Sequence, residues 1–291
     1  MLGSGNRNRY DPGGSMHATA RMRGENPNMT IIEKKTCLSP DEVMIAYSAS
    51  GAGDPGLVFI HGGLADRSFW DAQVNAFAAS HRVLALDLAG HGQSGANRGK
   101  WGIPEFGADV AAVVKAERLE QALLIGNSLG GPAAIEAALL LPERIIGVIG
   151  VDTFQSLDYT ITEEEAHQRA EAFQVDYAGC VKAMTNSLFH PDADPSVIAD
   201  AEGRMAKTSP KTAYVMFISL VGYKPADSAR KLSVPLRAIN GDIYPTDFAA
   251  VRKIKPDFSA LIMQHMGHYP MLERPEEFNR HLAEIVDDLS K

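Results

Sequence analysis

The sequence predicts an α/β protein with a mostly parallel central sheet, helices on both faces, and a helical insertion. The first observation is that short apolar runs alternate with helical segments between Leu57 and Val151, which is typical of βαβ units. The second is that this alternation stops at Thr153 and resumes only at Val234. The third is that polar residues follow several of the apolar runs, where the strands of a parallel sheet share one edge.

Composition narrows the class of protein. The chain has 291 residues, of which 45% are hydrophobic and 22% charged, as expected for a globular protein. The net charge of -8 argues against nucleic acid or an anionic membrane as a partner. Cys37 and Cys180 have no metal-like spacing, so both thiols are expected to be free in a reducing compartment. No apolar run reaches the roughly 18–20 residues of a membrane span.

The N-terminal half of the chain is expected to contain a leader followed by alternating strands and helices. Residues 1–29 lack the apolar stretch of a signal peptide and are expected to be a disordered leader, which favours a cytoplasmic location. Apolar and β-branched runs predict strands, and amphipathic segments predict helices. The expected strands are 31–35 and 43–47 as a hairpin, then 57–60, 82–87, 123–126 and 144–151, with helices at 68–79, 104–117 and 132–141.

The second half begins with the insertion. Residues 153–231 contain no strand-like run, and helices are expected at 162–175, 177–189, 195–207 and 211–221. Thr162 followed by three glutamates is a typical helix start. Strands at 234–239 and 258–263 and a final helix at 275–289 then complete the sheet domain. We therefore predict a core of residues 30–152 and 232–291 and a helical cap of residues 153–231.

The central motif is Gly126-Asn127-Ser128-Leu129-Gly130. It follows an apolar run and precedes an Ala/Leu-rich helical segment, which is the strand–turn–helix context of the G-x-S-x-G motif. Such a turn holds the serine in a strained backbone conformation, clear of the sheet edge, at the N-terminus of a helix that favours negative charge. A glycine-rich turn with a solvated serine is the alternative.

Residues able to do chemistry follow the other predicted strands as well. The order along the chain is serine, acid, histidine, which is the order of the α/β-hydrolase triad. The residues at the strand ends are His61-Gly62-Gly63, Asp87, Ser128, Asp152, Asn240-Gly241-Asp242 and Gly267-His268.

From about Val43 to Leu289 the chain resembles an α/β-hydrolase of the capped esterase/lipase, epoxide hydrolase and dehalogenase group. Four stretches carry this resemblance, and together they are far more specific than any one alone. They are His61-Gly62-Gly63, the loop from Asp87 to Ser94, the turn around Ser128, and the segment from Met266 to Pro275. Epoxide hydrolases and dehalogenases carry an aspartate at the turn, so Ser128 argues against their chemistry here.

The resemblance implies a role for each of these residues. Ser128 is the expected nucleophile, and His268 is the base that a serine hydroxyl needs. The backbone N–H groups of Gly63 and Leu129 are expected to stabilise the oxyanion of the tetrahedral intermediate. His265 is an alternative base, although it is expected to end the last strand. Asp87 is expected to organise loops, and Asp66 to cap the helix that follows it.

The acid of the triad is the least determined residue. Many relatives place it three residues after the glycine that ends the penultimate strand, but that position holds Tyr244. Haloalkane dehalogenases place it at the end of the preceding strand, where Asp152 stands. We favour Asp152, with Asp242 as the alternative and Asp247 behind it. A structural role at the hinge of the cap is the competing interpretation of Asp152.

Three functional hypotheses follow. The first is a carboxylesterase that forms an acyl-enzyme, and the second is a C–C bond hydrolase, lactonase or perhydrolase that uses the same triad. The third is a non-catalytic binding or receptor member of the fold. We expect a small ester as substrate, no cofactor, no metal, no nucleic-acid or membrane partner, and a monomer or homodimer.

Overall fold

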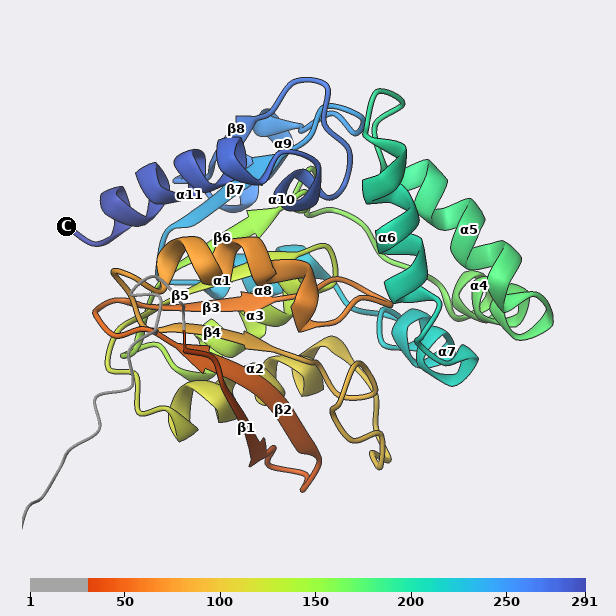
Figure 1. Ribbon diagram of the computed structural model, residues 1–291, viewed down its shortest axis with the longest axis horizontal. Coiled ribbons are helices and arrows are strands. Elements are labelled where there is room, and N and C mark those ends of the chain that lie inside the picture. The colour runs from red at the N-terminus through yellow and green to blue at the C-terminus, as the bar shows by residue number, and fades with distance from the viewer. Residues whose placement is uncertain (1–30) are drawn as a thin grey trace, which may run out of the picture.

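A mostly parallel sheet forms the centre of the molecule (Figure 1). The computed structural model describes residues 31–291, so the leader predicted at 1–29 lies outside the described residues. Within 31–291 the sheet has eight strands in the order β1-β2-β4-β3-β5-β6-β7-β8, and β2 runs antiparallel to both its neighbours. The strands are β1 (Glu33–Leu38), β2 (Met44–Ser50), β3 (Gly56–Ile60), β4 (Val83–Leu86), β5 (Ala122–Asn127), β6 (Ile145–Val151), β7 (Leu236–Asn240) and β8 (Ser259–Ile262). The predicted fold class is confirmed.

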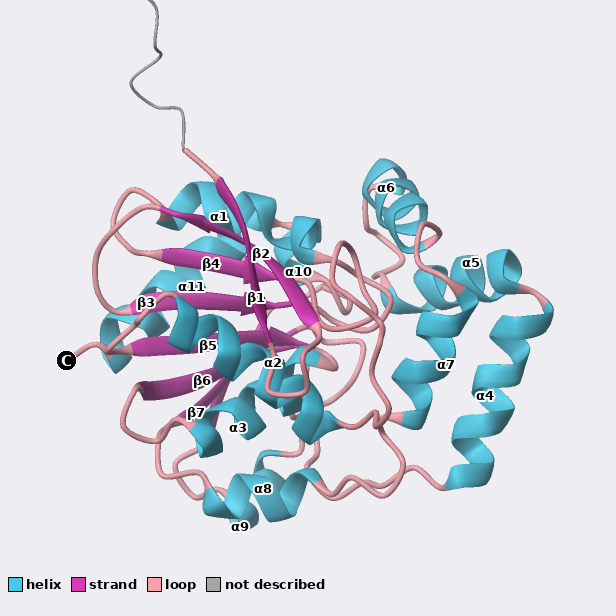
Figure 2. Ribbon diagram, turned by 90° about the horizontal axis from the view of Figure 1, so that it is seen from below, coloured by secondary structure: helices cyan, strands magenta, loops and turns pink. Residues whose placement is uncertain are grey.

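Helices cover both faces of this sheet. Helix α1 (Asp71–Phe77) packs with α11 (Pro275–Leu289) on one face, and α2 (Ile103–Ala116) packs with α3 (Gly130–Leu140) on the other (Figure 2). Every residue of β3, β4 and β5 is buried, as expected for central strands enclosed on both sides. Burial of these apolar runs is the main favourable term that holds the sheet together.

The helix expected at 68–79 differs in detail from the observed structure. It is divided into a 3₁₀ helix, η1 (Arg67–Trp70), and α1, because the backbone of Trp70 departs from helical geometry. The Asp66 side chain accepts a hydrogen bond from the Ser68 N–H at 2.8 Å and so caps η1. Asp66 therefore has the structural role that the sequence favoured.

The insertion between β6 and β7 is helical, and all of its helices except the last lie at one end of the sheet (Figure 1). The Thr162–Glu165 capping box starts its first helix, and the side chains of Asp176, Asp194 and Ser209 cap the next three. The helices are α4 (Glu163–Val175), α5 (Tyr177–Leu188), α6 (Pro195–Met205), α7 (Pro210–Ile218) and α8 (Pro225–Lys231).

Three helices were not predicted from the sequence. They are α8, α9 (Phe248–Ile254) and α10 (Pro270–Glu273). Helix α8 packs against α3, where Tyr223 and Ser228 both donate hydrogen bonds to Glu136. These helices have seven, seven and four residues, which is too short for an apolar period to be recognised.

Two expectations, free cysteines and the lack of a membrane span, can be compared with the structure of residues 31–291. Cys37 and Cys180 are both free thiols, and burial raises the pKa of Cys37 to about 11. Among the helices of this part of the chain, none combines the length and the apolar character needed to cross a bilayer.

Candidate active site

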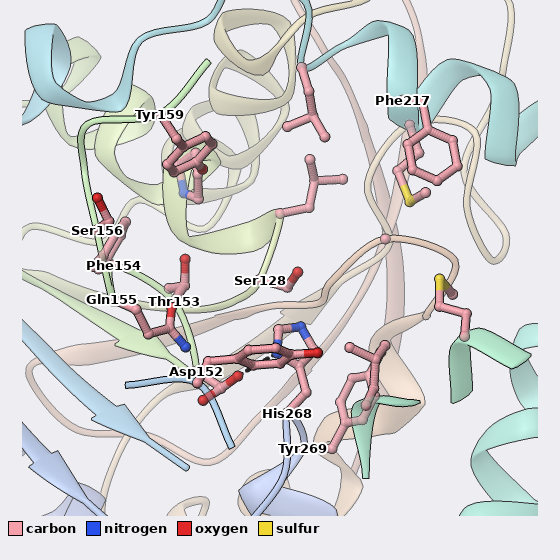
Figure 3. A pocket seen from close by; sticks show the side chains of 18 residues that line it. Ser128, Asp152, Thr153, Phe154, Gln155, Ser156, Tyr159, Phe217, His268 and Tyr269 are labelled. Carbon is pink, nitrogen blue, oxygen red and sulfur yellow. Dashed lines mark hydrogen bonds and ion pairs between the residues drawn. The ribbon is translucent and has the colours of Figure 1, made fainter. Parts of the chain in front are cut away.

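The predicted site residues lie around one cavity of about 480 Å³ at the carboxyl ends of the strands. Ser128, Leu129, Gly63, Asp152 and His268 all line it. Figure 3 shows Ser128, His268 and Asp152 grouped on one wall, below the aromatic side chains of the opposite wall. The structure therefore brings together five residues that come from four separate segments of the chain.

Ser128 directly follows β5 and has a φ of 50°, in the left-handed region that residues with a side chain rarely adopt. The turn is so tight that a Cβ on Gly126 would overlap the Gly130 carbonyl, so only glycine fits there. Such strain persists only where the surrounding structure over-determines it. Here β5 and α3 fix both ends of the turn, and Ser128 faces the cavity.

His268 and Asp152 are in direct contact. The His268 Nδ1 atom lies 2.5 Å from Asp152 Oδ2, and the Asp152 side chain is 1% exposed. The second carboxylate oxygen, Oδ1, accepts a hydrogen bond from the Gly241 N–H at 2.9 Å. A carboxylate held in this way fixes the imidazole ring with its Nδ1 proton toward the acid, which leaves the Nε2 lone pair available to a proton.

The carboxylates of the other two candidate acids accept hydrogen bonds from groups other than His268. The Asp242 carboxylate accepts hydrogen bonds from the backbone N–H groups of His265 at 2.9 Å and Met266 at 3.1 Å. These bonds, with that from His265 the largest cause, lower the pKa of Asp242. Asp247 caps α9 by accepting from the Ala250 N–H. Of the three carboxylates, Asp152 is the one that contacts His268.

Gly63 and Leu129 both line the cavity. Within residues 31–291 the backbone N–H of neither residue donates to a protein acceptor, which is the condition expected of oxyanion donors. The Gly63 loop also approaches the serine closely, since a Cβ on Gly62 would lie 3.1 Å from the Ser128 Cβ. The Met216 side chain of α7 covers Gly63 so tightly that a Cβ there would overlap it.

Three polar residues that the sequence analysis did not assign hold the loops of the site. The Asn127 side chain donates to the carbonyls of Val151 at 2.9 Å and His268 at 3.0 Å. The side-chain amide oxygen of Asn240 accepts from the Thr153 N–H, and the Glu273 carboxylate accepts from the Gly267 N–H. The sequence offered a signal for each of them: Asn127 adjoins the serine, Asn240 follows a strand-like run, and Glu273 lies in the Met266–Pro275 segment that carries the resemblance.

The insertion also makes hydrogen bonds to the loops of the site. The His268 N–H donates to the Leu188 carbonyl of α5 at 2.6 Å. The Thr208 hydroxyl donates to the Leu64 carbonyl at 2.9 Å, directly after the glycine of the proposed oxyanion site. The insertion therefore contacts both the histidine loop and the Gly63 loop.

His265 does not end the last strand as expected. Strand β8 finishes at Ile262, and His265 lies in the following loop with its side chain 68% exposed and a φ of 57°. Its ion-pair partner is Asp192 of the insertion, at 3.8 Å, and not a group of the cavity. The prediction for this residue was wrong because apolar residues continue to Met263, one residue past the last hydrogen-bonded pair.

Two buried histidines shape the loops beneath the cavity. His61 donates from Nδ1 to the Gly62 carbonyl and accepts from the Leu88 N–H at Nε2, so it is neutral. Burial lowers the pKa of His61 to about 4 and that of His91 to about 3. Asp87 accepts from the backbone N–H groups of Arg67 and Gln93, which is the loop-organising role expected of it.

These histidines predict acid sensitivity of the fold. Because the folded-state pKa of His91 lies below its unfolded value of 6.5, the unfolded chain binds more protons, and stability falls as pH drops below 6.5 toward 3. Between pH 7 and pH 5 this group should cost about 2 kcal/mol of unfolding free energy. Urea unfolding of the wild type and of His91→Asn at both pH values measures the difference, which should be smaller in the variant.

Asparagine is the matched substitution, since its amide can replace the Nδ1–H donor to the Ala89 carbonyl without titrating. If wild type and variant lose the same stability between pH 7 and pH 5, His91 is not a source of the acid sensitivity.

Two known hydrolases are similar to this chain over most of its length. The model of the alpha/beta hydrolase family matches residues 57–281. The pimeloyl-(acyl-carrier protein) methyl ester esterase of Edwardsiella ictaluri is 38% identical over 258 residues, covering 84% of this chain and 98% of that one. The 3-oxoadipate enol-lactonase 2 of Acinetobacter baylyi is 26% identical over 89% of this chain and 98% of its own length.

A shorter sequence match and a structural match illustrate the range of relatives. RutD of Azorhizobium caulinodans is 38% identical over 100 residues, a stretch that spans only 37% of that protein. A thermophilic esterase from Thermogutta terrifontis superimposes with a TM-score of 0.79 at 22% identity, over 89% of this chain and all of that one, which shows the fold alone.

The family match and the two relatives similar over most of the chain identify a hydrolase. The chain belongs to the alpha/beta hydrolase family.

Proposed function

We propose that the protein hydrolyses carboxylic esters through an acyl-enzyme formed on Ser128. His268 removes the hydroxyl proton as the Oγ attacks the ester carbonyl, and the N–H groups of Gly63 and Leu129 stabilise the oxyanion. His268 then gives that proton to the departing alcohol. A water molecule, deprotonated by the same ring, attacks the acyl-enzyme, and the acid and free Ser128 are released.

The observation that carries this proposal is the 2.5 Å contact between His268 Nδ1 and Asp152 Oδ2, beside the strained turn at Ser128. Asp152 is proposed to hold the ring in the tautomer that accepts a proton at Nε2 and to stabilise the imidazolium that forms. A hinge or helix cap would not need a buried carboxylate aimed at the ring of a cavity-lining histidine.

The cavity favours neutral, moderately apolar esters. Its walls carry neither lysine nor arginine, so nothing in the lining would neutralise an anionic substrate. The apolar wall comes mostly from the insertion, which we propose acts as a cap over the site, and consists of Leu129, Pro132, Met184, Leu188, Met216, Phe217 and Leu220. A polar strip of Thr153, Gln155 and Ser156 lies beside Asp152 (Figure 3).

Labelling with a fluorophosphonate probe tests the mechanism. The probe should modify Ser128 and no other serine, since this hydroxyl alone is paired in the proposal with a base and an oxyanion site, and peptide mapping identifies the labelled residue. Turnover of neutral p-nitrophenyl esters should exceed that of esters with an acyl carboxylate. Labelling at another serine, or none, would remove the acyl-enzyme mechanism.

Lactone hydrolysis on the same residues is the second candidate. It is favoured by the similarity over almost the full chain to an enol-lactonase. Carbon–carbon hydrolysis and perhydrolysis use the same triad but gain no support from a particular contact. A substrate panel that pairs open-chain esters with lactones of equal carbon number separates the first two candidates. No turnover of any member, together with no probe labelling, would favour the binding-module hypothesis.

A further inference from the structure

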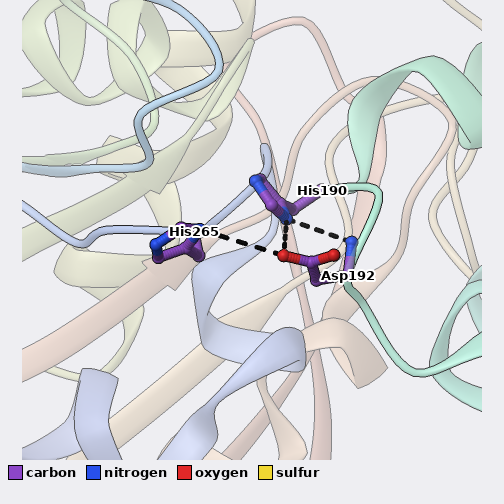
Figure 4. Close-up of side chains that lie close together, drawn as sticks. All are labelled: His190, Asp192 and His265. Carbon is purple, nitrogen blue, oxygen red and sulfur yellow. Dashed lines mark hydrogen bonds and ion pairs between the residues drawn. The ribbon is translucent and has the colours of Figure 1, made fainter.

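A second cluster of ligating side chains lies outside the cavity (Figure 4). His190 and Asp192 belong to the segment between α5 and α6 of the insertion, and His265 belongs to the loop that follows β8. The Asp192 Oδ2 atom lies 3.6 Å from Nδ1 of His190 and 3.8 Å from Nδ1 of His265. One potential donor atom from each residue lies within 4.8 Å of the others.

These separations suit a small divalent cation. Zinc binds imidazole nitrogen and carboxylate oxygen tetrahedrally at about 2.0–2.2 Å, which places two such donors about 3.4 Å apart. The observed distances of 3.6 and 3.8 Å are within a few tenths of an ångström of that value. His190 Nδ1 accepts a hydrogen bond from the Asp192 N–H at 3.1 Å, so this nitrogen is unprotonated, and an ion bound at Nδ1 would replace that hydrogen bond.

The surroundings hold the two histidines in place and are negatively charged. The Asp242 carboxylate fixes the backbone N–H of His265, whose φ of 57° is unusual for a residue with a side chain. The Glu273 carboxylate accepts from the His190 N–H at 3.4 Å. The Asp192 and His265 side chains are 75% and 68% exposed, so an ion can enter and a water molecule can complete its coordination.

We propose that His190, Asp192 and His265 bind a divalent transition-metal ion of the zinc class. The ion would join the insertion to the loop that carries His268, three residues after His265. Because only the folded chain brings these residues together, binding would stabilise the fold and restrain the insertion against the sheet domain. Mixed imidazole and carboxylate donors favour zinc over magnesium or calcium.

Calorimetric titration of the full chain with Zn²⁺ tests the proposal. One site is expected, and His265→Asn and Asp192→Asn should each weaken Zn²⁺ binding at least about tenfold. Both side chains are exposed, and asparagine tolerates the left-handed backbone at position 265, so the variants should fold. The Zn²⁺-dependent rise in the unfolding midpoint should be lost in the same variants.

Two controls make the outcome specific. His167→Asn removes an exposed histidine that lies 3.6 Å from the Glu163 carboxylate but has no third ligand among residues 31–291, and it should leave Zn²⁺ affinity unchanged. Magnesium should produce no comparable heat at the same concentration. The proposal is overturned if His265→Asn and Asp192→Asn bind Zn²⁺ as tightly as the wild type, or if His167→Asn abolishes binding.

Discussion

Replacing Ser128 with alanine is expected to lower kcat for ester hydrolysis by roughly 10⁵–10⁶-fold, because the covalent route disappears with the hydroxyl. The oxyanion donors and the cavity remain, so a small residual rate above that in water is expected. Stopped or continuous assays with p-nitrophenyl acetate and butyrate, at saturating substrate, measure the change. KM should move little, since the hydroxyl contributes to the transition state more than to binding.

A matched control separates chemistry from folding. Ser187→Ala removes an exposed hydroxyl of α5 that bonds its own helix at Met184, and its kcat should equal that of the wild type. The unfolding midpoint of Ser128→Ala should be equal to or above the wild-type value, because the Ser128 hydroxyl makes no hydrogen bond within residues 31–291. A purified, folded Ser128→Ala protein with wild-type turnover would rule out Ser128 as the nucleophile.

Asp152→Asn is expected to reduce kcat by about 10⁴-fold while leaving KM nearly unchanged. The amide can still contact the imidazole, but it would present an N–H or a neutral oxygen to Nδ1 and would favour the wrong tautomer. It also removes the charge that stabilises the imidazolium. Measurement of kcat and of its pH profile with the same p-nitrophenyl ester tests this expected fall in kcat.

Asp242→Asn is the discriminating comparison, since it makes the same chemical change at the other strand end. It should reduce kcat by less than about tenfold, because Asp242 holds two backbone N–H groups of the His265 loop and does not contact the ring. Loss of one of these bonds should lower the unfolding free energy by about 1 kcal/mol. A larger fall in kcat for Asp242→Asn than for Asp152→Asn would reverse the assignment of the acid.

Much of the fold could be predicted because its signals are local. The buried strands are continuous apolar runs, and the helices of the insertion start at capping residues such as Thr162 and Asp194. The errors fall where local signals fail. Helices of four to seven residues, such as α8 and α10, are too short to show an apolar period. The break in the helix at Trp70 comes from its backbone geometry, which its residue type does not predict.

The cluster of His190, Asp192 and His265 illustrates a different limit. Metal sites are recognised from sequence by close ligand spacing, and His190 and His265 come from the insertion and from the last loop of the sheet domain. Their contact depends on how the segment after α5 lies against that loop, which is fixed by the hydrogen bonds of Leu188 and Glu273.

The sequence by itself determined the sheet, the serine turn and the histidine loop. Each is formed by consecutive residues, so it can be recognised without knowing which distant residues it contacts. Tertiary structure decided which carboxylate stands beside His268. Neighbouring parallel strands end about 4.8 Å apart, so spacing does not separate Asp152 after β6 from Asp242 after β7, and the sequence favoured Asp152 only through the resemblance to haloalkane dehalogenases. The two side chains point in different directions. Asp152, with a φ of 44°, contacts the imidazole, whereas the Asp242 carboxylate accepts hydrogen bonds from the backbone of His265 and Met266.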